Sequence, residues 1–134
     1  GRSDDTLKVA GKRLGPAEVE EVALELPSVA EAAAIGVSDP DKGQRLVVFV
    51  VPSPNQDSIK VAQDVTRHVE KRLGKPFKPS VVHCVAQLPK TRSSKIMRRV
   101  IRSVYCNQPP GDLSSLDNPI ALDEVRAAAA RSFA

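Results

Sequence analysis

Lys95 lies at the centre of the residues in this chain that are best suited to chemistry. The polar segment Lys90–Ser94 passes directly into a stretch of helical periodicity that begins at Ile96. We therefore expect Lys95 on an exposed loop, at or just inside the N-terminus of a helix that Ser93 or Ser94 caps. A cation there opposes the helix dipole until a negative ligand arrives, so this lysine is suited to meeting an anion.

The same cluster of charges has a simpler interpretation. Arg98, Arg99 and Arg102 lie on the predicted helix opposite its apolar residues, and such runs are commonly solvated faces or anion-attracting patches. A basic module that binds nucleic acid is therefore the alternative function. Few aromatic side chains could stack on bases, namely Phe49, Phe77, Tyr105 and Phe133.

Length and composition indicate one ordinary domain. A chain of 134 residues can bury its own core, and with 3% aromatic residues and no Trp that core must consist of Val, Leu, Ile and Ala. The net charge of +4 suits a nucleotide or a coenzyme as well as a nucleic acid.

The cysteines and the apolar runs limit the choice of compartment. Cys84 and Cys106 form no CxxC pair, so we expect neither a metal site nor a disulfide, and a reducing intracellular compartment, cytoplasm or mitochondrial matrix. No apolar run approaches the roughly 20 residues that span a bilayer, and we expect no membrane association. The opening GRSDD lacks an initiator Met, as in a piece of a longer protein.

The periodicity predicts an α+β fold, with a small three-stranded sheet, packed helices and an N-terminal two-stranded hairpin. Gly11 marks the bend of the hairpin, and the run LVVFVV reads as a central strand covered on both faces. The remaining predicted elements are a helix from Pro16 to Leu26, strands at 30–37, 46–51 and 81–86, a helix at 58–73, a helix from 96, and a last helix at 120–130. The helix at 58–73 is expected to be capped by Ser58, to bury Ile59 on its apolar face and to end at Gly74.

Several other polar residues are given structural roles. Glu18 and Glu20 are expected only to favour the first turn of their helix. His68 and His83 lie near no Asp, Glu or Ser pattern that suggests a triad or a metal site.

Two long motifs resemble those of a known superfamily. PKTRSSKI (89–96) resembles the PKTRSGK-type signature of adenylate-forming enzymes, and GRSDDTLKVAGKRLGPAEVE (1–20) resembles their GRxDDxxxxxGxRxxxxEIE signature. The family includes acyl-CoA synthetases, peptide-synthetase adenylation domains and luciferases. The resemblance implies that Lys95 is the catalytic lysine of the adenylation half-reaction. Ser94 stands where the family usually has glycine, which can take positive φ at little cost.

The first motif implies further roles. Asp4 matches the aspartate on which the C-terminal domain swings against a large N-terminal adenylation domain, although the residues alone suggest only a turn. Gly11 and Arg13 match a loop that lies along the pantetheine tunnel. An arginine that meets the phosphates of coenzyme A is matched by Glu70, so that role would have moved to Lys71 or Arg72 or been lost.

The C-terminal part of the sequence indicates which subfamily the chain resembles. IMRRVIRSVY followed by GDLSSLDNPIALDEV resembles the end of acetyl- and propionyl-type synthetases. This implies a C-terminal lid domain at 1–106 with its hinge at 1–5, then a linker and helix at 107–134. ATP, Mg²⁺ and coenzyme A would be substrates of the full-length enzyme, none held tightly by this part. Lys95 would also be a target for an acetyltransferase and a deacetylase, and no nucleic acid would bind.

Overall fold

The architecture is the predicted α+β type. The computed structural model describes residues 6–9, 11–40 and 43–133, so Asp4 and the rest of the proposed hinge lie outside the described residues. The elements are β1 (Leu7–Val9), β2 (Lys12–Leu14), α1 (Pro16–Leu24), β3 (Val29–Asp39), β4 (Gly43–Pro52), α2 (Ser58–Leu73), the 3-10 helix η2 (Lys75–Phe77), β5 (Val81–Cys84), α3 (Arg98–Tyr105) and α4 (Ala121–Phe133).

Strand β4 is the centre of the sheet, as the LVVFVV run predicts. It pairs antiparallel with β3 from Val29↔Pro52 to Asp39↔Gly43, and parallel with β5 on its other side. Because successive residues of a strand point to opposite faces, β4 contributes to two separate cores. Val47 and Phe49 belong to one core, and the alternating residues Leu46, Val48 and Val50 belong to the other.

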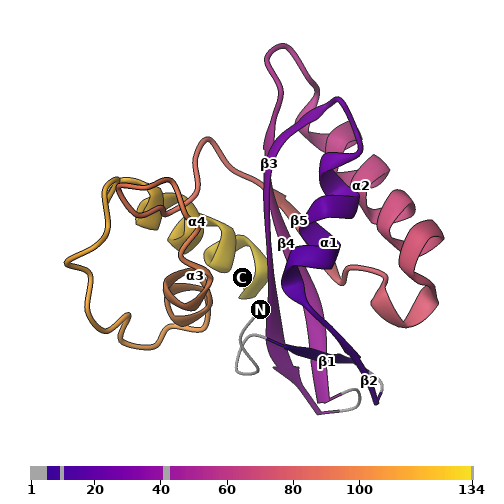
Figure 1. Cartoon of the computed structure of the whole chain (residues 1–134), viewed down its shortest axis with the longest axis horizontal. Helices are drawn as coiled ribbons and strands as arrows, with labels where there is room; N and C mark the ends of the chain where they lie inside the picture. The colour runs from indigo at the N-terminus through magenta and orange to yellow at the C-terminus, as the bar shows by residue number, and fades with distance from the viewer. Residues whose placement is uncertain (1–5, 10, 41–42, 134) are drawn as a thin grey trace.

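Two pairs of helices cover the two faces of this sheet (Figure 1). On one face α1 and α2 pack through Val19, Val61 and Val65. On the other face α3 and α4 pack through Ile101 and Val125. The sheet is therefore the middle of three layers. Both cores are mainly aliphatic, as the composition predicts, and the core under α3 and α4 also holds Phe49 and Tyr105.

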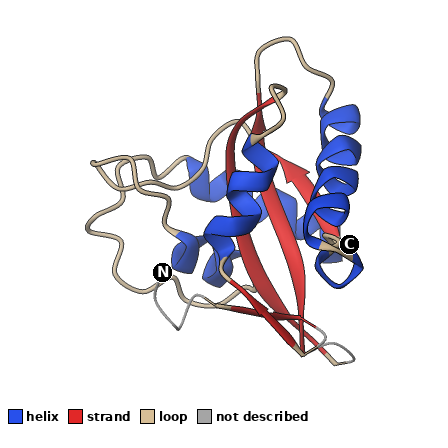
Figure 2. Cartoon of the chain, turned by 45° about the vertical axis from the view of Figure 1, so that its right-hand side comes forward, coloured by secondary structure: helices blue, strands red, loops and turns tan. Residues whose placement is uncertain are grey.

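The predicted hairpin is present, and it extends the sheet. β1 and β2 pair antiparallel with Leu7 opposite Leu14, and β1 joins the start of β4 through Val9↔Gly43. The amide of Lys8 adds a hydrogen bond of 2.8 Å to Oε1 of Gln44. Figure 2 shows the hairpin at the lower end of the long strands.

Helix α2 differs in detail from its prediction. The Asp57 carboxylate, and not Ser58, caps the helix by accepting from the amide of Ile59 at 3.0 Å. Ile59, expected in the core, is 71% exposed, and Val61 is buried there instead. The predicted end at Gly74 is confirmed, since that residue has φ +100° and its amide bonds to the carbonyl of Glu70.

The last helix is also confirmed, and the segment before it follows an ordered path. A turn from Asn118 leads into α4, where Leu122 and Val125 belong to the same core as α3. The preceding residues touch the loop of Lys95 through a bridge between Thr91 and Leu116. In the part of the chain that the structure describes, no helix combines the length and apolar character needed to cross a membrane.

Candidate functional site

Lys95 lies in a tight loop that precedes α3. The loop is closed by a bridge between Lys90 and Ile96. Within it, the amide of Thr91 donates to the carbonyl of Lys95 at 2.9 Å, and the amide of Lys95 donates to Oγ1 of Thr91 at 3.1 Å. The loop therefore has a defined backbone, and Lys95 is exposed upon it.

The prediction that Lys95 lies at a helix N-terminus is wrong. Helix α3 begins at Arg98 with Met97 as its N-cap, and neither Ser93 nor Ser94 caps it. The reason is that the backbone before α3 bonds elsewhere, with the amide of Met97 donating to the carbonyl of Pro89 at 2.9 Å. Ile96 therefore pairs as a strand residue instead of starting the helix.

Ser94 adopts the backbone conformation that glycine would take at this position. Its φ is +68°, in the left-handed region, and its amide donates to the carbonyl of Thr91 at 2.9 Å. The serine is held in this region by the hydrogen bonds of the loop, although it carries a Cβ atom. Such a conformation costs roughly 1–2 kcal/mol for a residue with a Cβ atom.

The two lysines of the signature have different surroundings. Nζ of Lys90 forms an ion pair of 2.5 Å with Oε1 of Glu31 on β3. Lys95 makes no ion pair with any residue that the structure describes. Its side chain lines an open depression of about 450 Å³ together with residues of the loop and of the tail, namely Thr91, Arg92, Ser93, Ser114 and Ser115.

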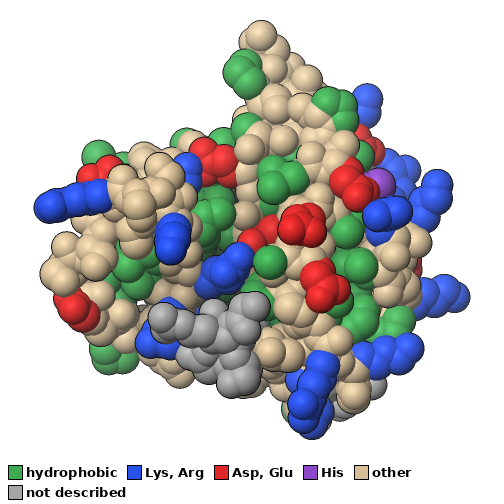
Figure 3. Space-filling model, viewed as in Figure 1, with side chains coloured by type: hydrophobic (Ala, Val, Ile, Leu, Met, Phe, Trp, Pro, Cys, Tyr) green, Lys and Arg blue, Asp and Glu red, His purple; other side chains and the backbone are tan. Residues whose placement is uncertain are grey.

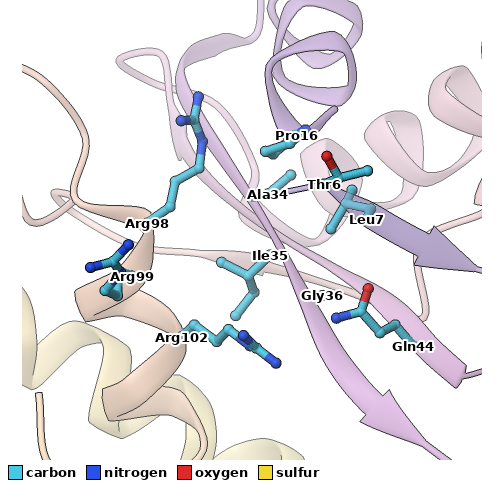
Figure 4. A pocket seen from close by; sticks show the side chains of 10 residues that line it. All are labelled: Thr6, Leu7, Pro16, Ala34, Ile35, Gly36, Gln44, Arg98, Arg99 and Arg102. Carbon is cyan, nitrogen blue, oxygen red and sulfur yellow. The ribbon is translucent and has the colours of Figure 1, made fainter. Parts of the chain in front are cut away.

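A second hollow, of about 350 Å³, separates α3 from the start of β1. Its lining residues are Thr6, Leu7, Pro16, Ala34, Ile35, Gly36, Gln44, Arg98, Arg99 and Arg102. In Figure 4 the side chain of Arg98 extends from α3 toward α1, whereas that of Arg102 extends toward the side on which Gln44 lies. On the face that Figure 3 shows, basic and acidic side chains lie beside one another near the centre.

Glu20 has a larger role than predicted. Its side chain is buried, and its two oxygens accept from Nε and Nη2 of Arg98 at 2.7 and 2.5 Å. Helical spacing offered a signal for this burial, because Glu20 follows Pro16 by one turn and precedes Ala23 by another, and both are buried. Arg98 is therefore not part of a freely exposed basic face, which weakens the nucleic-acid alternative.

The two candidate site residues of the hairpin, Gly11 and Arg13, are exposed. Gly11 has φ +81°, so the bend requires a left-handed backbone, and a Cβ atom built there would meet no atom within 4 Å. Arg13 lies on β2, also exposed. In Figure 1 this hairpin is at the lower end of the sheet, and the segment leading to α3 runs on the opposite side of the sheet from α2. The structure thus places the hairpin and Lys95 on separate elements.

The two candidate cations of α2 differ in their partners. Nη2 of Arg72 pairs with Oε2 of Glu25 at 3.1 Å, and the other oxygen of Glu25 is 2.8 Å from Nε2 of His68. Lys71 is exposed and makes no ion pair with a described residue. His68 thus contributes to the contact between α1 and α2, in line with its predicted structural role.

His83 is buried between the sheet and α3. Its Nε2 is 3.0 Å from the hydroxyl of Tyr105, and its ring packs 5.3 Å from that of Phe49. Burial, and secondarily the positive charge of Arg131, lowers the pKa of His83 to about 4. Among the described residues, no group of three His, Cys, Asp or Glu side chains could hold a metal ion.

These features define a small α+β domain that presents a lysine on a structured loop. A family model described as AMP-binding enzyme C-terminal domain matches residues 18–95, which end at that lysine. The chain belongs to this family.

Similar proteins agree with that assignment. The chain is 45% identical to the 3-hydroxypropionyl-coenzyme A synthetase of Sulfurisphaera tokodaii, over 96% of this chain and 19% of that protein. It is 45% identical to the acetyl-coenzyme A synthetase of Methanothrix thermoacetophila, over 93% of this chain and 19% of that protein. It is 43% identical to the propionate–CoA ligase of Escherichia coli, over 96% of this chain and 21% of that protein. The chain therefore spans about a fifth of the length of these relatives.

Solved structures show the same fold. An acyl-CoA synthetase from Brucella canis matches with a TM-score of 0.70 and 38% identity, over 77% of this chain and 19% of that one. The acetoacetyl-CoA synthetase from Streptomyces lividans matches 98% of this chain and 20% of that one, with a TM-score of 0.82. At 24% identity, the second match supports the fold alone.

Proposed function

We propose that this chain is the mobile C-terminal domain of an AMP-forming acyl-CoA synthetase of the acetate or propionate type. The rest of that enzyme would be a large N-terminal adenylation domain, with Asp4 at the hinge. The enzyme would convert a carboxylate and ATP, with Mg²⁺, into an acyl-adenylate and pyrophosphate. Coenzyme A would then displace AMP to form the thioester. The relatives named as acetyl-coenzyme A synthetase and propionate–CoA ligase support this class.

The observation that carries the proposal is the difference between Lys90 and Lys95. Lys90 is held by Glu31, whereas Lys95 is exposed on an ordered loop with no acidic partner among the described residues. Its ammonium group is therefore available to an incoming anion. A carboxylate that approaches an α-phosphate brings like charges together, and a positioned ammonium stabilises the charge that develops. A compact cation on a flexible stem can also withdraw when the domain turns.

The second step would use the hairpin. Gly11 leaves the space beside the bend empty, which suits the passage of a pantetheine arm, and Arg13 lies next to it on β2. Lys71 is the better of the two α2 candidates for the coenzyme A phosphates, because Arg72 already pairs with Glu25. A larger rise in the KM for coenzyme A in Lys71→Ala than in Arg72→Ala would support this choice.

The test of the proposal is the Lys95→Ala variant of the full-length enzyme. Carboxylate-dependent ATP–pyrophosphate exchange should fall by about 10²–10³, the usual effect of losing a group that stabilises developing charge. Thioester formation from preformed acyl-adenylate should remain within about twofold of wild type. Lys60→Ala, an exposed lysine on α2, is the control and should change neither step. Equal losses in both half-reactions would show that Lys95 is structural.

The same assay tests regulation at this lysine. Acetylation removes the positive charge, so an acetylated Lys95, or the Lys95→Gln variant, should behave like Lys95→Ala. The exposure of Lys95 makes it accessible to an acetyltransferase and a deacetylase. Incubation of the enzyme with an acetyltransferase should then block pyrophosphate exchange but spare the thioester step.

A further inference from the structure

The tail of the chain holds the base of the Lys95 loop. We name residues 116–118 the tail strap. Leu116 forms a bridge with Thr91, and the amide of Asp117 donates to the carbonyl of Lys90 at 2.9 Å. Oδ1 of Asn118 accepts from the amide of Lys90 at 2.9 Å. Both backbone polar groups of Lys90 are therefore bonded to the tail strap.

Asn118 also fixes the residues that lead into the loop. Its Nδ2 donates to the carbonyl of Leu88 at 2.8 Å and to Oε1 of Gln87 at 3.1 Å. A half-buried amide that makes three hydrogen bonds has little freedom to rotate, since each lost bond leaves a polar group unpaired. Asn118 thus bonds to three residues at the entrance to the loop, Gln87, Leu88 and Lys90.

The other side of the loop base is held by the sheet. Nζ of Lys90 pairs with Glu31 on β3, so the tail strap holds the backbone of Lys90 and the sheet holds its side chain. Helix α4 adds a contact just upstream, where Oε1 of Glu124 accepts from the amide of Ala86 at 2.6 Å. Only the turn formed by residues 91–94 separates Lys90 from Lys95. A movement of Lys90 at the loop base therefore also displaces Lys95.

We infer that Asn118 is a positioning residue for adenylation, and that the tail strap sets the place of the Lys95 ammonium group. This inference rests on the proposed role of Lys95. Asn118 itself bonds to residues 87, 88 and 90, not to Lys95, so it acts through the loop. Displacement of a catalytic group by about 1 Å can cost about 10² in rate. The strap lies beyond residues 18–95, which the family model matches.

The experiment compares Asn118→Ala with Gln108→Ala in the full-length enzyme. Gln108 is an exposed amide residue of the same tail outside the strap, so it controls for the loss of an amide. Asn118→Ala should lower the kcat of pyrophosphate exchange about tenfold or more, with KM values for ATP and carboxylate and the rate of the thioester step within about twofold. Gln108→Ala should match wild type. Equal losses in both half-reactions, or no loss in exchange, would overturn the inference.

Amide hydrogen exchange provides a readout that does not depend on activity. In Asn118→Ala the amides of Lys90, Lys95 and Met97 should exchange about tenfold faster, because the loop base opens more often, whereas amides of α2 should be unchanged. Unchanged protection of these three amides would overturn the inference even if activity fell. If Lys95→Ala retained pyrophosphate exchange, the proposed function would fail separately, and hydrogen exchange would still decide whether the strap holds the loop.

A milder variant covers the case in which Asn118→Ala does not fold. Asn118→Asp keeps an oxygen for the amide of Lys90 but loses the donors to Leu88 and Gln87. It should give the same selective loss of exchange with less effect on unfolding. A folded Asn118→Asp enzyme with wild-type exchange and wild-type protection of the loop amides would contradict the inference.

Discussion

Glu20 and Arg98, 78 positions apart in the chain, form a two-point ion pair around the free edge of the sheet. Glu20 lies on α1 over one face and Arg98 begins α3 over the other, and β3 is the edge strand between them. Oε2 of Glu20 also accepts from the amide of Ala34 on β3 at 2.9 Å. One carboxylate therefore satisfies an edge-strand amide and fixes the start of the helix that follows the Lys95 loop.

Removing this carboxylate should destabilise the domain. Glu20→Ala removes the carboxylate that accepts from the Ala34 amide and from the half-buried guanidinium of Arg98. This loss should lower the free energy of unfolding by about 2 kcal/mol. Glu21→Ala, at the exposed neighbouring position, should cost less than about 0.5 kcal/mol. Urea denaturation of the three proteins makes the comparison, and equal effects at the two positions would contradict the role given to Glu20.

The two adjacent serines of the loop should respond oppositely to glycine. Ser94→Gly relieves a left-handed serine, and after the entropy cost of glycine the free energy of unfolding should rise by a few tenths of a kcal/mol. Ser93→Gly adds the entropy cost of glycine without relieving a left-handed backbone, and it also removes a 3.0 Å contact between the hydroxyls of Ser93 and Thr91. The free energy of unfolding should therefore fall by about 1 kcal/mol. Thermal unfolding distinguishes the signs. Destabilisation by Ser94→Gly would mean that the serine is not strained.

Gly11 can be tested for backbone freedom and for lack of bulk separately. Gly11→Ala should cost roughly 1–2 kcal/mol because φ is +81°, whereas Asn tolerates this region and Gly11→Asn should cost only a few tenths. In the full-length enzyme, Gly11→Asn and Gly11→Leu should both slow thioester formation while adenylation continues, so that bound acyl-adenylate accumulates. Normal thioester yield from a folded Gly11→Leu enzyme would refute the proposed pantetheine path.

His83 should make the domain less stable in mild acid. The pKa of this histidine falls from 6.5 to about 4 on folding, so between these values the unfolded chain binds more protons than the folded one. Stability due to the neutral ring is complete above pH 6.5 and is lost as pH falls toward 4, by about 3 kcal/mol at most.

A pH series of urea denaturation curves measures that slope. His83→Gln, which can still bond to Tyr105, should flatten the dependence between pH 6.5 and 4. His68→Gln should retain it, because the exposed contact of His68 with Glu25 is separate from the core. A slope that survives His83→Gln would assign the effect to other groups.

Local patterns in the sequence were enough to predict most of the elements. The unbroken apolar run from Leu46 to Val51 predicts a strand covered on both faces, because only such a strand is apolar at every position. Gly74 predicts the end of α2, and Gly11 the bend of the hairpin, since each provides a backbone conformation that is costly for other residues. The resemblance of two motifs identified the family to which the chain belongs.

The tertiary structure decided the surroundings of the candidate site. Ile96 has helical spacing, yet it pairs with Lys90, because the backbone groups around Lys95 bond to Thr91 and Pro89 before a helix can begin. Glu20 acquires its role only when α1 and α3 pack against the same edge strand. Asn118 meets Lys90 only when the tail folds back, over a separation of 28 positions. Local periodicity predicts which residues share a face, but it cannot say which distant groups will satisfy one another's hydrogen bonds and charges once water is excluded.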